Sequence, residues 1–67
     1  MLDFQVNDMT CNHCAGAITR AIQAIDAGAR VQVDLEAKRV QVDPATADAP
    51  QVAAAIEEAG YTPERLA

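Results

Sequence analysis

The sequence predicts an α+β fold, a ferredoxin-like sandwich in which two helices cover one face of a four-stranded antiparallel sheet. Segments that alternate apolar and polar residues predict strands, and segments that repeat apolar residues every three or four positions predict helices. Their order along the chain is β-α-β-β-α-β, which is the ferredoxin-like arrangement. The chain has 67 residues, which is room for one domain, so we expect a single domain over residues 1–67.

The first strand and the first helix are predicted within residues 2–28. Apolar residues alternate with polar ones at the start, at Leu2, Phe4 and Val6. After a loop, apolar residues recur at helical spacing from Cys14 onward and should face the core: Ala15, Ile18, Ile22 and Ile25. The helix ends at residues 26–28, where Gly28 is suited to a left-handed cap.

The second half of the chain predicts a hairpin, a helix and a short last strand. Two alternating segments, joined by a tight connection at 36–39, form the hairpin: Val31, Val33, Leu35, Val40 and Val42. The second helix starts near Asp48 and Pro50, because proline loses no hydrogen bond in a first turn. Its buried stripe precedes Gly60: Val52, Ala55, Ile56 and Ala59. Residues 62–66 form a fourth strand, which Pro63 confines to a sheet edge or a bulge.

Composition and charge exclude several classes of function. The net charge is −5, which disfavours binding to nucleic acid or to an anionic membrane surface. No apolar run approaches the roughly 20 residues of a membrane span, and the first residues do not resemble a signal peptide. We therefore expect a cytoplasmic protein, which its start at Met1 and its end at Ala67 suggest is independent. So small a domain has little volume for a catalytic cleft, so we expect no enzyme.

The segment Met9-Thr10-Cys11-Asn12-His13-Cys14 carries the chemistry, because it places two cysteines where a loop enters a helix. Unpaired N–H groups and the dipole at a helix N-terminus stabilise a thiolate, and Cys14 should gain most. Two thiolates suit a soft ion such as Cu(I), whereas structural zinc requires four ligands. Thr10 supplies no carboxylate oxygen to favour a harder ion. The sequence thus predicts one Cu(I) between Cys11 and Cys14.

Three further residues are candidates for auxiliary roles. Met9 is either a core residue or a third, thioether ligand, and the core is the favoured interpretation. His13 is predicted to point outward and not to be a primary ligand, but its imidazole can serve a second metal or a second chain. Tyr61 either packs beside the second helix or lies over the metal-binding loop. These alternatives are not separated by the sequence.

The chain resembles the heavy-metal-associated domains, and among them the stand-alone bacterial copper chaperones. The resemblance covers essentially the whole chain and rests on M-T-C-x-x-C at residues 9–14, the order of strands and helices, and the Gly60-Tyr61 pair before the last strand. It implies Cu(I) ligation by Cys11 and Cys14, packing of Met9 beneath the loop, and delivery of copper to a copper-transporting P-type ATPase. The exposed loop further suggests a metal-bridged homodimer.

Two other functions compete with this interpretation. A Cys-x-His-Cys sequence also occurs in thiol-disulfide oxidoreductases, where the imidazole and the helix dipole stabilise a reactive thiolate. Such domains are longer and usually carry a tryptophan before the motif, and this chain has none. The second competitor is a carrier or a transporter domain for another thiophilic ion, such as zinc, cadmium or mercury.

Overall fold

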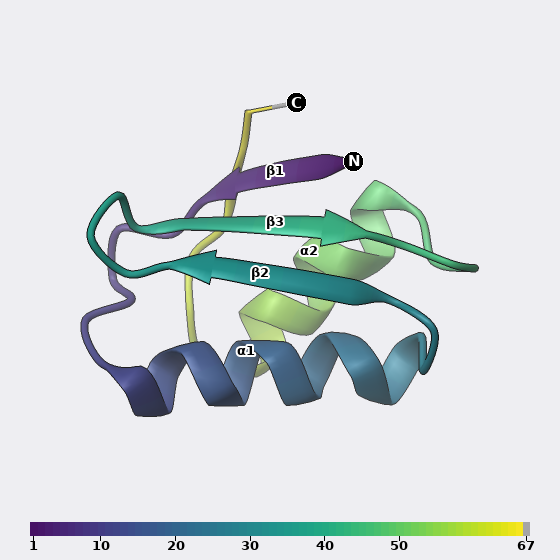
Figure 1. Cartoon of the computed structure of the whole chain (residues 1–67), viewed down its shortest axis with the longest axis horizontal. Helices are drawn as coiled ribbons and strands as arrows, with labels where there is room; N and C mark the ends of the chain where they lie inside the picture. Colours follow the sequence, from purple (N-terminus) through teal and green to yellow (C-terminus); the bar gives the residue numbers. More distant parts are fainter. Residues whose placement is uncertain (67) are drawn as a thin grey trace.

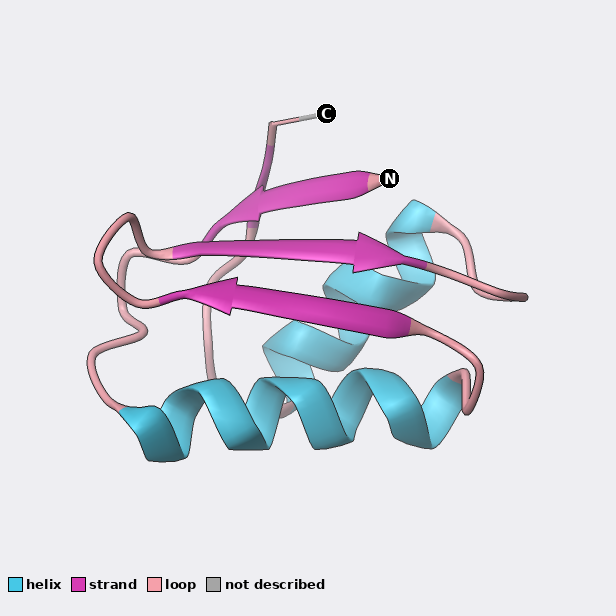
Figure 2. Ribbon diagram, viewed as in Figure 1, coloured by secondary structure: helices cyan, strands magenta, loops and turns pink. Residues whose placement is uncertain are grey.

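The order of elements predicted from the sequence is confirmed in the computed structural model, which describes residues 1–66 (Figure 1). The elements are β1 (Leu2–Gln5), α1 (Asn12–Ile25), β2 (Arg30–Asp34), β3 (Arg39–Asp43), α2 (Ala49–Glu58) and β4 (Glu64–Arg65). Both helices lie on the same face of the sheet (Figure 2). Within the described residues, no helix is long and apolar enough to cross a membrane.

The sheet has the strand order β2-β3-β1-β4, and every neighbouring pair is antiparallel. Its registers place apolar residues in rows on the helix-covered face; Phe4, Val40 and Val33 form one such row. The opposite face carries polar residues, among which Arg39 of β3 forms an ion pair with Asp3 of β1. The short β4 lies at the sheet edge, where Pro63 was expected to confine it.

The core is aliphatic, as the near absence of aromatic residues requires. Side chains from both helices, from the central strands β1 and β3, and from the segment between β1 and α1 are completely or almost completely buried: Phe4, Val6, Met9, Ile18, Ile22, Val40, Val42, Val52 and Ile56. Burial of each such side chain contributes about 1.5–3 kcal/mol. Cys14 also belongs to this core, but neither cysteine is among its largest fully buried side chains.

Three local expectations were wrong. Ile25 is 48% exposed and not part of the buried face, because it is the last residue of α1 and the next residue, Asp26, turns inward in its place. Gly28 does not adopt a left-handed conformation. Glycine fits this position because the backbone lies against Ala45: a Cβ added to Gly28 would come within 2.9 Å of the Ala45 Cβ. Finally, Ala15 was expected to face the core, but it is only partly buried and does not belong to the core cluster.

The end of α2 agrees with the sequence. Gly60 has φ 99°, a conformation that favours glycine. The Gly60 N–H donates to the Glu57 carbonyl, and the Tyr61 N–H donates to the Ile56 carbonyl. These two bonds form a Schellman motif, which satisfies carbonyls that the helix would leave unpaired. The motif turns the chain back toward the cysteines immediately at Tyr61.

Candidate metal centre

Cys11 and Cys14 lie together at the start of α1. Cys11 is the N-cap residue and is exposed, whereas Cys14 lies in the first turn and is buried, 9% exposed. Their Sγ atoms are 3.0 Å apart, and both are free thiols. Among residues 1–66, no three His, Cys, Asp or Glu side chains converge as a metal-binding cluster. The start of α1 therefore presents two neighbouring sulfur atoms, one on an exposed residue and one on a buried residue.

The start of α1 is not closed by a side-chain cap. Cys11 makes no side-chain capping hydrogen bond, and the first turn contains no acidic residue. The backbone N–H groups at a helix start carry a partial positive charge and attract anions. An anionic sulfur at this position therefore gains stabilisation that a capping carboxylate would otherwise take.

The Cys14 thiol ionises more readily than an ordinary cysteine, and its pKa is lowered to about 6. The largest cause is a hydrogen bond from the Tyr61 hydroxyl, followed by one from Cys11 and one from the Thr10 backbone N–H. The same contact with Cys14 raises the pKa of Tyr61 to about 12. The sequence predicted that the helix start would stabilise this thiolate; the largest cause of the lowered pKa is instead the hydroxyl of Tyr61, which is 47 residues away in the sequence.

Tyr61 reaches the cysteines because two loops are joined. The Thr62 N–H donates to both carboxylate oxygens of Asp8, at 3.2 and 3.1 Å. Tyr61 itself is half-buried and packs against the core cluster. It therefore both packs beside α2 and places its hydroxyl at Cys14. Sequence reasoning did not identify Asp8, because its partner lies 54 residues further along the chain.

The other predicted site residues occupy different environments. Met9 is completely buried in the core, as the favoured interpretation expected. Thr10 and His13 are exposed. Thr10 contributes its backbone N–H rather than its hydroxyl, because that N–H donates to Cys14. His13 lies between the two cysteines in sequence with its side chain open to solvent, where a second metal or a second chain can reach it.

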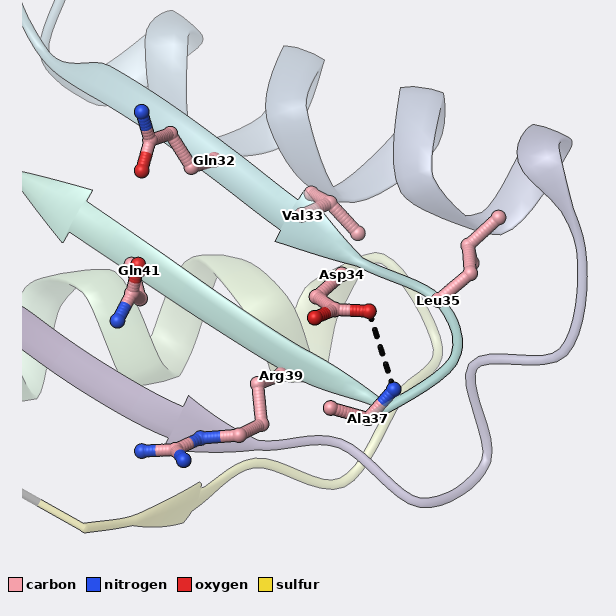
Figure 3. A pocket seen from close by; sticks show the side chains of 7 residues that line it. All are labelled: Gln32, Val33, Asp34, Leu35, Ala37, Arg39 and Gln41. Atoms are coloured by element: carbon pink, nitrogen blue, oxygen red, sulfur yellow. Dashed lines mark hydrogen bonds between the residues drawn. The ribbon is translucent and has the colours of Figure 1, made fainter.

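An open groove lies along the β2–β3 hairpin, and neither cysteine lines it (Figure 3). Polar side chains such as Gln32, Gln41 and Arg39 line it. Leu35 is directed from the hairpin toward α1, where it packs against the core. The groove contains no thiol and no imidazole, so it offers nothing to a soft metal ion.

A model of the heavy-metal-associated domain family matches residues 3–62. The chain belongs to this family. It is 36% identical over 64 residues to the copper chaperone CopZ of Enterococcus hirae, covering 92% of this chain and 93% of the relative.

Solved structures give the same assignment. The copper chaperone Atx1 from Synechocystis PCC6803, in a trimeric form, has a TM-score of 0.91 and 41% identity over 96% of this chain and 100% of its own. The N-terminal domain of PacS from the same organism has a TM-score of 0.81 and 31% identity over 98% and 96% of the two chains. The ferredoxin-like fold expected from the sequence is thus confirmed by relatives as well as by the strand order.

Proposed function

We propose that this protein is a copper chaperone that binds one Cu(I) between Cys11 and Cys14. The observation that carries the proposal is the pair of free sulfurs 3.0 Å apart, one exposed and one buried, at an uncapped helix start. A soft ion with a d¹⁰ configuration is satisfied by two or three sulfurs. The similarity to CopZ and Atx1, both named as copper chaperones, supports copper as the cargo.

Copper is delivered by exchange of sulfur ligands. The exposed Cys11 sulfur is the ligand that an incoming thiolate displaces first, while the buried Cys14 sulfur retains the ion through a three-coordinate intermediate. In this step only copper–sulfur bonds form and break. The protein therefore acts as a carrier and not as an enzyme, and it works in a reducing compartment such as the cytoplasm, where adjacent thiols stay free.

The proposed acceptor is the soluble metal-binding domain of a copper-transporting P-type ATPase. The N-terminal domain of PacS has the same fold as this chain, so a domain of this kind also occurs as the terminal part of a larger protein. A metal-bridged homodimer is a second mode of sulfur sharing, in which the exposed Cys11 and His13 of two chains meet around copper. The trimeric form of the similar Atx1 structure supports association of such domains.

An anaerobic titration tests the proposal. Cu(I) and Zn²⁺ are each added in competition with a chelator of known affinity, and the complex is weighed by mass spectrometry. We expect one Cu(I) per chain, held much more tightly than Zn²⁺. Cys11→Ser and Cys14→Ser should each lower the Cu(I) affinity by about 100-fold or more, since half of the ligand set is lost.

A circular dichroism spectrum of each variant is the control for folding in this titration. Both serine variants should keep the wild-type circular dichroism spectrum, because the largest fully buried side chains of the core are other residues. Retention of near-wild-type Cu(I) affinity by either variant would contradict the two-thiolate site. Efficient disulfide exchange with no Cu(I) binding would instead support the redox alternative.

A further inference from the structure

The tip of the β2–β3 hairpin lies at the same end of the molecule as the loop that carries the cysteines (Figure 1). Several hydrogen bonds join the two segments. The Gln5 side-chain amide donates to the Ala37 carbonyl at 2.9 Å and to the Lys38 carbonyl at 3.1 Å. The Val6 N–H donates to the same Lys38 carbonyl at 2.8 Å. The hairpin tip therefore supports the chain where it leaves β1 for the metal-binding loop.

Lys38 contacts this loop a second time, through its side chain. Its ammonium group donates to the Met9 carbonyl at 3.4 Å. Lys38 thus holds both the start of the segment, at Val6, and its end, at Met9. Cys11 follows two residues later. The side chain is half-buried and is the sole lysine of the sequence.

The Met9 carbonyl and the Thr10 N–H belong to one peptide group, and they point in opposite directions across it. Lys38 binds the carbonyl side of this group. The Thr10 N–H on the other side is one of the groups whose interaction with the Cys14 sulfur lowers the pKa of that thiol. A cation on the carbonyl oxygen polarises the peptide group and makes its N–H a stronger donor, since hydrogen bonds in a chain reinforce one another. The peptide group therefore links the Lys38 ammonium to the sulfur.

The backbone of Lys38 indicates that the side chain matters. Its φ is 57°, in the left-handed region that glycine adopts more readily. Glycine and asparagine are the residues that most often occupy a left-handed position in a turn. The lysine keeps an unfavourable backbone conformation, and strained positions of this kind concentrate at functional sites.

We propose that Lys38 is a positioning residue for the metal site: its ammonium orients the Met9–Thr10 peptide group so that the Thr10 N–H faces the Cys14 sulfur. This inference rests on the proposed function, because the complex it stabilises is that of Cu(I) with two thiolates. Such a complex carries one net negative charge. The ammonium favours it both through the oriented peptide group and through its own charge, without contacting the metal.

The test compares variants that separate three properties of Lys38: its positive charge, its hydrogen-bond donor and its left-handed backbone. Lys38→Met removes the ammonium and keeps the length, and Lys38→Arg restores a cationic donor. Lys38→Gly removes the side chain and relieves the left-handed backbone. Arg30→Met is the matched control, because it removes one exposed positive charge at the opposite end of β2. Two quantities are measured: Cu(I) affinity by chelator competition, and the amide proton chemical shift of Thr10 in the metal-free protein.

We expect Lys38→Met to lower the Cu(I) affinity by about tenfold, as is usual for groups that orient metal ligands. Its Thr10 amide proton should move upfield, because the hydrogen bond to sulfur weakens. Lys38→Arg should recover most of both effects, and Arg30→Met should change neither. Lys38→Gly should melt at or above the wild-type temperature while losing as much Cu(I) affinity as Lys38→Met. A purely structural role for Lys38 predicts no such separation of stability from metal binding.

The proposal is overturned if Lys38→Met binds Cu(I) as tightly as Arg30→Met does, or if its Thr10 amide shift is that of the wild type. The two readouts also separate this inference from the proposed function. A wild-type protein that does not bind Cu(I) refutes the chaperone assignment. The Thr10 shift in the metal-free variants still decides whether Lys38 orients the peptide group.

Discussion

The two helices begin in opposite ways, and the difference marks the functional end of the molecule. At the start of α2, the Asp48 side chain accepts from the Gln51 N–H and the Gln51 side chain accepts from the Asp48 N–H, each at 3.0 Å. This capping box is complete, and Pro50 lies in the first turn. At the start of α1, Cys11 forms no cap. One helix start is therefore closed for stability, while the other is left open to anionic sulfur.

A second set of hydrogen bonds, to one buried carboxylate, stabilises the α2 start. Asp26 is 3% exposed, and one of its carboxylate oxygens accepts from the N–H groups of Ala45, Thr46 and Ala47 at 2.8, 2.8 and 3.0 Å. These bonds lower the pKa of Asp26 to about 2. They fix the chain immediately before Asp48. Hydrogen bonds to a buried carboxylate therefore reinforce the α2 start itself. At the metal-binding end, hydrogen bonds hold the preceding loop, and the start of α1 stays uncapped.

The largest effect in this comparison is expected for Asp26→Asn. The amide carries no charge and binds three N–H groups less well, so the melting temperature should fall by about 10 °C. The folded-state pKa of Asp26 lies below its unfolded value, so its stabilisation is present above about pH 4 and lost as the pH falls toward about 2. The variant should lose this part of the acid transition. Asp43→Asn, on an exposed side chain, is the control in thermal and acid melts.

Tyr61→Phe tests how the thiolate at the uncapped start of α1 is stabilised. Without the hydroxyl, the Cys14 pKa should rise from about 6 toward the ordinary value of about 8.5. Since copper binds the thiolate, Cu(I) affinity at pH 7 should fall by up to about 30-fold, and the loss should disappear above about pH 9. Affinity measured across this pH range decides the point. A uniform loss at every pH would show that Tyr61 acts by packing alone.

Changing the cap residue of each helix should shift the melting temperature in opposite directions, by less than Asp26→Asn does. Asp48→Ala should cost about 1 kcal/mol, which lowers the melting temperature by about 4–8 °C. Cys11→Asp should raise the melting temperature by a few degrees, because a carboxylate closes the open start of α1. The same change should abolish tight Cu(I) binding. If Cys11→Asp destabilised the fold, the uncapped start would not represent stability withheld for function.

The smallest effect is expected for His13→Ala. The exposed imidazole is not a primary ligand, so Cu(I) affinity of the monomer should stay within about tenfold, or about 1.4 kcal/mol, of the wild type. Zn²⁺ binding and copper-dependent dimerisation should weaken more. Chelator competition and analytical ultracentrifugation measure the two properties. A monomer affinity that fell far more than tenfold would place the ring on the metal.

Local sequence patterns predicted the features that depend on residues close together in the chain. Alternation located the strands, helical spacing located the core faces, and Gly60 marked the end of α2. The features that were missed depend on contacts across the chain: Asp26 with residues 45–47, Asp8 with Thr62, and Lys38 with Met9. No periodicity encodes such pairs, since each needs the fold before its partners meet. For the same reason, the motif located the thiols, while the largest cause of the Cys14 pKa shift became visible only in three dimensions.

X-ray absorption at the copper edge of the anaerobically loaded monomer tests the central claim most directly. The account predicts a Cu(I) edge with two sulfur neighbours and no nitrogen neighbour, because Cys11 and Cys14 are the donors and His13 is not. The spectrum should be unchanged in His13→Ala and should lose a sulfur in Cys11→Ser. A nitrogen neighbour in the wild-type monomer, or two sulfurs retained in Cys11→Ser, would contradict a site made from this thiolate pair.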